Sequence, residues 1–381
     1  MNLTGENNFP VILNVAKKSM GRKTGRLSPL LFFIPALLTV FGVFMIYEAS
    51  SINSSRLYGD AFLFVKQQLK WFGLALIVYW FFMKFDYHYL YSLALIALVV
   101  NIVLLVLIFI PGFSSTVLGA KRWLSLGPIR LQPSEFSKFS LIIYLSAWFS
   151  FKERGRFFAF ILLISLLIGL VILQPDMGTA SILGLCAVYL YFISGAPYSQ
   201  FFLLIIIGLV AGAFFVFSSP YRLSRLTAYL DPKTDPQGIT YHINQVNTAL
   251  SLGGWFGTGY GSSKQKFQFL PEAHTDSIFA IIGENFGFAG TTILISSYLI
   301  FFYNLYLNII KIKDRLGFLL ASSILFLLII QCLINLAAMA QLIPLTGIPL
   351  PFISYGGSSL LTLYALLGIM YNVFRYHKTY V

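Results

Sequence analysis

The chain has 381 residues, of which 58% are hydrophobic and 10% are Asp, Glu, Lys or Arg, and its mean hydropathy is +0.81. A soluble fold of this length cannot bury so much apolar surface, so the composition excludes an ordinary soluble domain and indicates an integral membrane protein. The formal net charge of +13 does not indicate nucleic acid as a partner, because the cations flank apolar runs where anionic membrane lipids attract them.

Apolar runs of membrane-spanning length recur along nearly the whole chain. An α-helix of about 20 apolar residues crosses the hydrocarbon layer, whereas a transmembrane β-barrel needs short alternating segments. We therefore predict an all-α polytopic membrane protein with about ten transmembrane helices. The expected spans are residues 28–50, 69–84, 90–111, 134–150, 157–173, 177–195, 199–218, 277–309, 316–338 and 358–376. The run from 277 is too long for one straight crossing, which predicts a tilted helix or a helical segment outside the membrane ahead of the span.

Lysines and arginines in the short loops and tails predict the orientation. Their distribution favours a multi-pass protein of the cytoplasmic membrane with both termini in the cytoplasm. We interpret residues 1–27 as a basic cytoplasmic tail rather than a cleavable signal peptide, and 28–381 as one membrane domain. Segments 112–133, 219–276 and 339–357 then face outward, and 219–276 is the large extracytoplasmic loop.

The first outer segment contains a basic pair next to a tryptophan and continues into a pair of opposite charges. Lys121, Arg122 and Trp123 form a cationic aromatic patch that could contact a phosphate or a sugar, although a Trp at a membrane boundary is also a common anchor. Glu135 and Lys138 are an i,i+3 pair near the membrane, where ions tend to be paired and functional. The alternative is a plain helix start with a Lys138 that extends to the interface.

Two aspartates stand directly before apolar runs. The main interpretation of Asp176 is an N-cap of the helix that follows it. Asp276 is a candidate general base, because partial desolvation at the membrane boundary should raise its pKa and strengthen it as a proton acceptor. The alternative for Asp276 is an N-cap of a helix starting at Ser277. Glu284 lies eight residues further on a similar face, and an acid inside a span requires a function or a cationic partner.

The large outer loop carries cations and a glycine-rich stretch. Arg222 and Arg225 could neutralise a diphosphate, as cations do when charge develops on a leaving phosphate. The glycines of 253–261 match neither a dinucleotide nor a P-loop fingerprint, so we expect no nucleotide site. The loop ends with His274, two residues before Asp276.

Residues 344–359 combine prolines with adjacent glycines in an uncharged apolar context. Such a segment cannot be one regular helix, which predicts a re-entrant or broken segment that lines protein or water. Ser354, Gly356 and Gly357 are its candidate cavity residues.

Six motifs, in this order, resemble the SEDS family, named for shape, elongation, division and sporulation. They are GAKRW at 119–123, LQPSEFSK at 131–138, QPDMGTA at 174–180, LDPKTDP at 230–236, KQKFQFLPEAHTDSIFAIIGE at 264–284 and PLTGIPLPFISYGGSS at 344–359. The stretch before and including Asp276 is more similar to the division branch of the family than to the elongation branch.

The resemblance implies a ten-helix glycosyltransferase that polymerises lipid II into glycan strands outside the cytoplasmic membrane, for septal cell-wall synthesis. It implies a class B penicillin-binding protein and other divisome proteins as partners. By motif, the essential acid of the family falls on Asp276, its Trp after the basic pair on Trp123, and its charged helix pair on Glu135 and Lys138. The chain departs from the family at Asn285, where a second Glu is common.

The resulting hypothesis is an inverting transfer in which Asp276 takes the proton from the 4-hydroxyl of the acceptor N-acetylglucosamine. That oxygen attacks C1 of the donor N-acetylmuramic acid and displaces undecaprenyl diphosphate, with Lys121, Arg122, Arg222 and Arg225 as candidates to receive the diphosphate. No cofactor is identified; a divalent cation could assist, but no ligand cluster with recognisable spacing supports one. The alternatives are a lipid II flippase and a non-catalytic scaffold of the division machinery.

Overall fold

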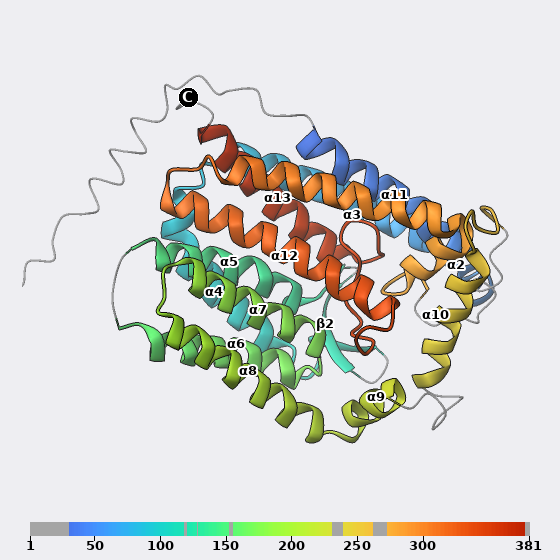
Figure 1. The fold of residues 1–381 in the computed structure, drawn as a ribbon, viewed down its shortest axis with the longest axis horizontal. Helices are drawn as coiled ribbons and strands as arrows, with labels where there is room; N and C mark the ends of the chain where they lie inside the picture. Colours follow the sequence, from blue (N-terminus) through green and yellow to red (C-terminus); the bar gives the residue numbers. More distant parts are fainter. Residues whose placement is uncertain are drawn as a thin grey trace, which may run out of the picture.

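The computed structural model describes residues 30–117, 120–127, 129–151, 155–230, 239–261 and 273–377, and long helices lying side by side form its body (Figure 1). Ten of the described helices coincide with the ten expected spans. They are α2 (Leu30–Tyr58), α3 (Leu63–Lys84), α4 (Tyr89–Leu107), α5 (Pro133–Ser150), α6 (Phe157–Leu173), α7 (Met177–Ile193), α8 (Tyr198–Phe217), α11 (Ile278–Ile309), α12 (Arg315–Met339) and α13 (Gly357–His377). Six of them, α2, α4, α8, α11, α12 and α13, are long and apolar enough to cross a membrane. The prediction of an all-α polytopic membrane protein is confirmed.

The segments that were predicted to face outward contain regular structure that the hydropathy pattern did not predict. The segment after α4 forms an antiparallel sheet of three strands, β1 (Ser114–Val117), β2 (Ala120–Leu126) and β3 (Ile129–Leu131), in that order. The large loop contains α9 (Pro220–Leu230) and α10 (Ile239–Gly253), and α10 lies across the end of the bundle where α2 ends (Figure 1). Short elements with mixed composition give no membrane-length apolar run, so hydropathy cannot detect them.

Glycine allows α3 and α13 to pack closely. A Cβ added at Gly368 would lie 2.6 Å from the carbonyl oxygen of Tyr79, and a Cβ at Gly357 would overlap the ring of Trp71. Small residues at such contacts let helices approach where lipid offers no hydrophobic driving force. On α8, by contrast, Leu204 is the one buried residue among those described, so nearly the whole surface of this helix is left uncovered by the rest of the protein.

The long helix α11 is broken at Gly287, whose backbone angles (φ 63°, ψ −161°) suit glycine and few other residues. The glycine-rich stretch 253–261 satisfies the backbone groups that the break releases. Four hydrogen bonds do this: Thr258 N to Glu284 O, Gly259 N to Asn285 O, Phe288 N to Gly254 O and Ala289 N to Trp255 O, at 2.9 to 3.1 Å. The segment 278–286 ahead of the break packs inside the protein. The prediction of one straight, tilted helix is therefore wrong, and the alternative, a separate helical segment ahead of the span, describes α11.

The segment between α12 and α13 has no regular helix, as its prolines and glycines predict. It is nevertheless packed into the core, because Ile348, Leu350, Phe352 and Ile353 are buried. Irregular backbone at this depth requires hydrogen-bond partners from neighbouring elements. We call residues 340–356 the irregular segment below.

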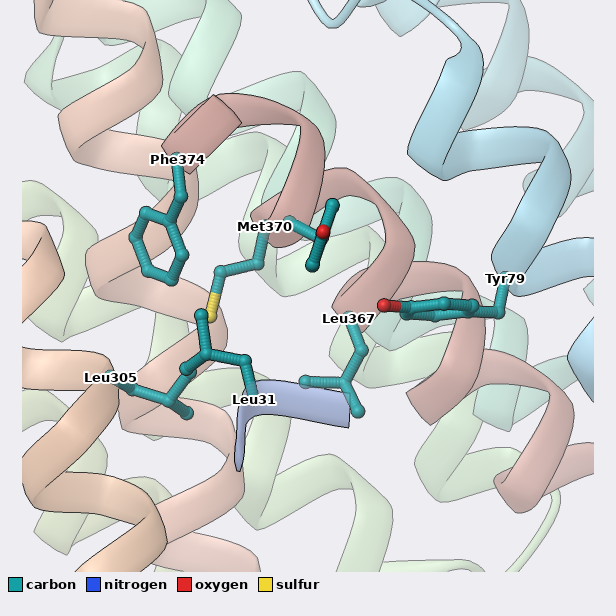
Figure 2. Close-up of a pocket in the computed structure, with 7 residues that line it drawn as sticks. Leu31, Tyr79, Leu305, Leu367, Met370 and Phe374 are labelled. Atoms are coloured by element: carbon teal, nitrogen blue, oxygen red, sulfur yellow. The ribbon is translucent and has the colours of Figure 1, made fainter. Parts of the chain in front are cut away.

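A small pocket lies between α2, α3, α11 and α13 (Figure 2). Its lining residues are Leu31, Tyr79, Leu305, Leu367, Met370, Tyr371 and Phe374. They come from the first turn of α2 and from the later turns of α3, α11 and α13. The pocket is therefore at the end of the bundle opposite the start of α11, and no charged side chain lines it.

Candidate active site

Asp276 lies in the short turn that leads into α11. Its side chain is half-buried, and its Oδ1 accepts from the hydroxyls of Thr275 at 3.3 Å and Ser277 at 3.4 Å. Ser277 occupies the N-cap position of α11 and makes no side-chain cap bond. The interpretation of Asp276 as the N-cap is therefore wrong, since the cap position belongs to the next residue.

The turn at Asp276 is joined to the irregular segment. The backbone N–H of Tyr355 donates to the carbonyl of His274 at 2.9 Å, and the His274 ring packs against Phe64 and Tyr355 with centroids 4.5 and 5.4 Å apart. A Cβ added at Gly347 would lie 3.9 Å from Oδ2 of Asp276. The candidate base thus borders the segment that was predicted to line a cavity.

The other candidates in this segment shape its backbone. Ser354 is buried, and its Oγ accepts from the N–H of Leu350 at 2.8 Å. The N–H of Gly356 donates to Oε1 of Gln68 on α3 at 3.3 Å, and Gly357 packs against Trp71 of the same helix. Gly356 therefore attaches the irregular segment to α3, Gly357 is the first residue of α13, and Ser354 makes its bond within the segment. None of these described contacts reaches the Asp276 carboxylate.

The predicted pair of opposite charges on α5 is a buried ion pair. Nζ of Lys138 lies 2.7 Å from Oε1 of Glu135, and the two side chains are 1% and 5% exposed. The alternative in which Lys138 extends to the interface is therefore wrong. Lys138 also donates to Oε1 of Gln331 on α12 at 3.3 Å, and Nε2 of Gln331 donates to the carbonyl of Pro349 at 3.1 Å. The ion pair is thus linked to the irregular segment.

Asn335 lies four residues after Gln331 on α12 and contacts the main chain of Asp276. Its Nδ2 donates to the carbonyl of Asp276 and to the carbonyl of Ile348, both at 2.8 Å. Residues four apart lie on the same face of a helix. One face of α12 therefore binds both the turn at Asp276 and the irregular segment.

Of the basic pair in the segment between α4 and α5, the structure describes the side chain of Arg122. Arg122 donates through Nε to the carbonyl of Gln174 at 3.2 Å and through Nη2 to the carbonyl of Pro175, which ties β2 to the turn between α6 and α7. Trp123 is half-buried on β2, whereas the side chain of Lys121 lies outside the described residues.

The two arginines of α9 bind different elements. Nη1 of Arg225 donates to the carbonyl of Leu345 at 3.1 Å, two residues before Gly347. Nη1 of Arg222 donates to the carbonyl of Phe215 on α8 at 3.0 Å. The structure therefore brings Arg225 to the segment that borders Asp276, and it connects Arg222 to α8.

Glu284 is fully buried next to the break in α11. A distance of eight residues corresponds to about 12 Å along a helix axis, so Glu284 lies well beyond Asp276 along α11. The neighbouring Asn285, where the family commonly has a second Glu, is also buried, and its side-chain nitrogen and oxygen have no hydrogen-bond partner among the described residues.

Asp176 caps α7, as predicted. Its Oδ1 accepts from the N–H of Thr179 at 3.1 Å. Its Oδ2 accepts from Oγ of Ser134 at 2.9 Å and from Nε2 of Gln132 at 3.1 Å. Asp176 therefore joins the start of α7 to the start of α5.

The described residues contain no group of three or more His, Cys, Asp or Glu side chains that could hold a metal ion. Cys186 and Cys332 are free thiols in the core, in agreement with their positions in apolar runs.

Comparison with known proteins gives the family. The "Cell cycle protein" family model of FtsW, RodA and SpoVE matches residues 28–379. The chain belongs to this family. The resemblance that the six motifs indicated is thereby confirmed.

Curated relatives and solved structures agree with this family. Stage V sporulation protein E of Bacillus subtilis is 37% identical over 363 residues, which cover 93% of this chain and 99% of that protein. The probable peptidoglycan glycosyltransferase FtsW of Trichlorobacter lovleyi is 37% identical over 353 residues, covering 90% and 92%. A chain of a solved peptidoglycan synthase complex has a TM-score of 0.74 at 25% identity, covering 92% of this chain and 97% of its own. RodA of Thermus thermophilus, with a TM-score of 0.67 at 24% identity and coverage of 91% and 96%, shares the fold.

Three polar side chains of this FtsW/RodA/SpoVE family member, which contact the turn at Asp276 or the irregular segment, were not selected from the sequence. Nε2 of His242 on α10 lies 2.7 Å from Oγ of Ser277, and Gln331 and Asn335 make the bonds described above. Gln331 and Asn335 did carry a signal, because two polar residues four apart in an apolar span require a reason. His242 gave none, since a histidine in an outer loop is ordinary.

Proposed function

We propose that the chain is a peptidoglycan glycosyltransferase that polymerises lipid II at the outer face of the cytoplasmic membrane, for septal cell-wall synthesis. The observation that carries the proposal is the half-buried carboxylate of Asp276 next to Gly347. Similarity to proteins named probable peptidoglycan glycosyltransferase FtsW supports the same reaction.

Asp276 acts as the general base in this proposal. Gly347 is exposed and has no side chain, so a sugar hydroxyl can approach Oδ2 of Asp276 there. The proton of the acceptor 4-hydroxyl moves to the carboxylate while the oxygen forms a bond to C1 of the donor sugar. The bond from C1 to the diphosphate breaks, undecaprenyl diphosphate leaves with its electron pair, and the anomeric centre is inverted. A positioned base contributes about 10²- to 10⁴-fold in rate.

Negative charge that develops on the leaving diphosphate requires cations. Arg225 is the first candidate, because it is bound to the irregular segment two residues before Gly347. Lys121, Arg122 and Arg222 are the further candidates from the outer segments. A guanidinium has five N–H donors in a planar fork, which suits phosphate oxygens.

The proposed orientation of the chain is supported by the lysines and arginines in its short loops and tails. Arg315, at the start of α12, donates to the carbonyls of Phe149 and Ser194, where α5 and α7 end. Asp276 stands at the start of α11, so the end of the bundle that holds Arg315 is the opposite end from the candidate base. The lysines and arginines of the short loops and tails lie at the Arg315 end, so the positive-inside rule favours a cytoplasmic location for that end and both termini, and an outer location for Asp276.

The partner is proposed to be a class B penicillin-binding protein, with other divisome proteins around it. The support is the structural similarity to a chain of a solved peptidoglycan synthase complex in which polymerisation and crosslinking are coordinated. Lipid II and undecaprenyl diphosphate are the substrate and the leaving product, and membrane lipids surround the helices.

Polymerisation of lipid II by the purified chain with its cognate class B partner tests the proposal. We compare wild type with Asp276→Asn and with Asp60→Asn as a matched control. Asp60 is a half-buried acid paired with Lys66 at 2.8 Å, in the loop between α2 and α3 at the same end of the bundle. The expected result is glycan from wild type and Asp60→Asn, and none from an Asp276→Asn complex that still assembles.

Two other outcomes would overturn parts of the proposal. Equal glycan from wild type and Asp276→Asn would mean that the base is another group. If assembled wild-type complex makes no glycan, the chain is better explained as a lipid II flippase or as a scaffold. Transport of lipid II across vesicles by the same preparation separates those two alternatives.

A further inference from the structure

A buried polar chain runs from the ion pair on α5 to the turn at Asp276. Lys138 donates to Gln331, Gln331 donates to the carbonyl of Pro349, and Asn335 donates to the carbonyls of Ile348 and Asp276. The side chains of Gln331 and Asn335 are 0% and 1% exposed. In a low dielectric, hydrogen bonds of this kind are strengthened, and a missing partner is costly.

Asn335 differs from the other members because one amide group binds two segments. Its Nδ2 carries two hydrogens, and with both acceptors at 2.8 Å both hydrogens are used. One acceptor belongs to Asp276 itself, and the other belongs to Ile348, next to Gly347. The Oδ1 atom of Asn335 is buried and has no hydrogen-bond partner among the described residues, so the donors make the contact.

Neither segment that Asn335 binds is a helix or a strand. Residues 273–277 form a turn, and the irregular segment contains Pro349 and Pro351, which lack an N–H, and Gly347 with φ 72°. α12 is a regular helix of 25 residues with much of its length buried. Sites held by helices are more exact than sites held by loops. α12 can therefore supply the rigid reference for both segments.

We propose that Asn335 is a positioning residue for Asp276, with Gln331 as a second anchor for the irregular segment. Asn335 sets the separation between the Asp276 carboxylate and the backbone at Gly347, where the acceptor sugar is expected. The inference rests on the proposed role of Asp276 as general base. A base must lie within about 2.6–3.2 Å of the group that gives its proton. A displacement of about 1 Å can cost about 10²-fold in rate.

Asn335→Gln tests the proposal, because it keeps both N–H donors and moves them outward by one methylene. If Asn335 only satisfies two buried carbonyls, glutamine can do the same and the rate is unchanged. If Asn335 positions the base, the complex folds but kcat falls while KM for lipid II is kept. Cys332→Ala is the matched control, since it changes an equally buried side chain one turn earlier on α12. Asp276→Asn is measured in the same series.

The expected result is a kcat for Asn335→Gln at least about tenfold below that of Cys332→Ala. KM changes by less than about twofold, and the two melting temperatures are similar. A kcat within about twofold of the control overturns the inference. If Asn335→Gln does not fold, Asn335→Ser, which shortens the side chain and keeps one donor, is judged by the same criteria. Normal kcat in Asn335→Gln with an inactive Asp276→Asn refutes only the positioning role, whereas an active Asp276→Asn refutes the proposed base.

Discussion

The start of α7 and the start of α11 both carry an aspartate, but Asp176 caps its helix and Asp276 does not. Asp176 is 8% exposed and accepts from a backbone N–H, a hydroxyl and an amide. Asp276 is half-buried, precedes the cap residue Ser277, and accepts from two flanking hydroxyls at the longer distances of 3.3 and 3.4 Å. The same local pattern therefore gives a structural acid at one helix start and a candidate base at the other.

The largest effect on activity is expected for Asp276→Asn, which distinguishes Asp276 from the structural acid Asp176. Asp276→Asn keeps the shape of the side chain and removes the base, so lipid II polymerisation should fall by at least about 100-fold. Its melting temperature should remain close to that of wild type, because Asp276 does not cap α11. A melting temperature that falls in step with activity would show that Asp276 is structural after all, like Asp176.

The ion pair on α5 is linked to both regions, since Ser134 on the same helix binds Asp176 and Lys138 binds Gln331, which donates to the irregular segment. Glu135→Ala leaves Lys138 as an uncompensated buried charge, and we expect a loss of about 3–5 kcal/mol in the free energy of unfolding. Chemical denaturation in detergent measures it. The double variant Glu135→Leu with Lys138→Met should recover much of this stability, because an apolar pair of similar volume carries no buried charge. No recovery would mean that the pair contributes more than charge compensation.

Asp176→Asn should lower the stability of the protein and keep its activity, whereas Asp276→Asn should lower the activity and keep the stability. It places an amide N–H₂ or a weaker acceptor opposite the donors of Gln132 and Ser134, which should cost about 1–3 kcal/mol in the free energy of unfolding. Polymerisation per folded complex should be retained. Thermal unfolding with the activity assay on the same preparation measures both, and a folded but inactive variant would contradict a purely structural Asp176.

The smallest effect is expected at the cap of α11. Ser277 makes no cap bond, so Ser277→Ala should lose only its hydrogen bonds to His242 and Asp276, a cost of about 1 kcal/mol. The free energy of unfolding and the rate should both change little. A large loss of rate with stability intact would instead give His242 and Ser277 a part in holding the Asp276 carboxylate.

Much of the fold could be predicted from the sequence, because each membrane crossing leaves a long apolar run. The ion pair and the cap at Asp176 were also predictable, since each depends on residues close together in the chain. The site was predicted less completely. The contact of Asn335 with Asp276 joins residues 59 apart, and the break at Gly287 is satisfied by a stretch about 30 residues earlier. The spacing of apolar residues predicts which face of a helix is buried, but it does not predict which distant backbone group that face contacts.

The break in α11 also bears on how the chain is made. The backbone groups released at Gly287 need partners in a lipid environment, and their partners lie in 254–259. Those residues leave the ribosome before α11 does, since synthesis runs from the N-terminus. With the orientation proposed above, the glycine-rich stretch must already be across the membrane when α11 is inserted. Residues 254–259, which satisfy the backbone groups at the break, are therefore synthesised before α11, the helix that needs them.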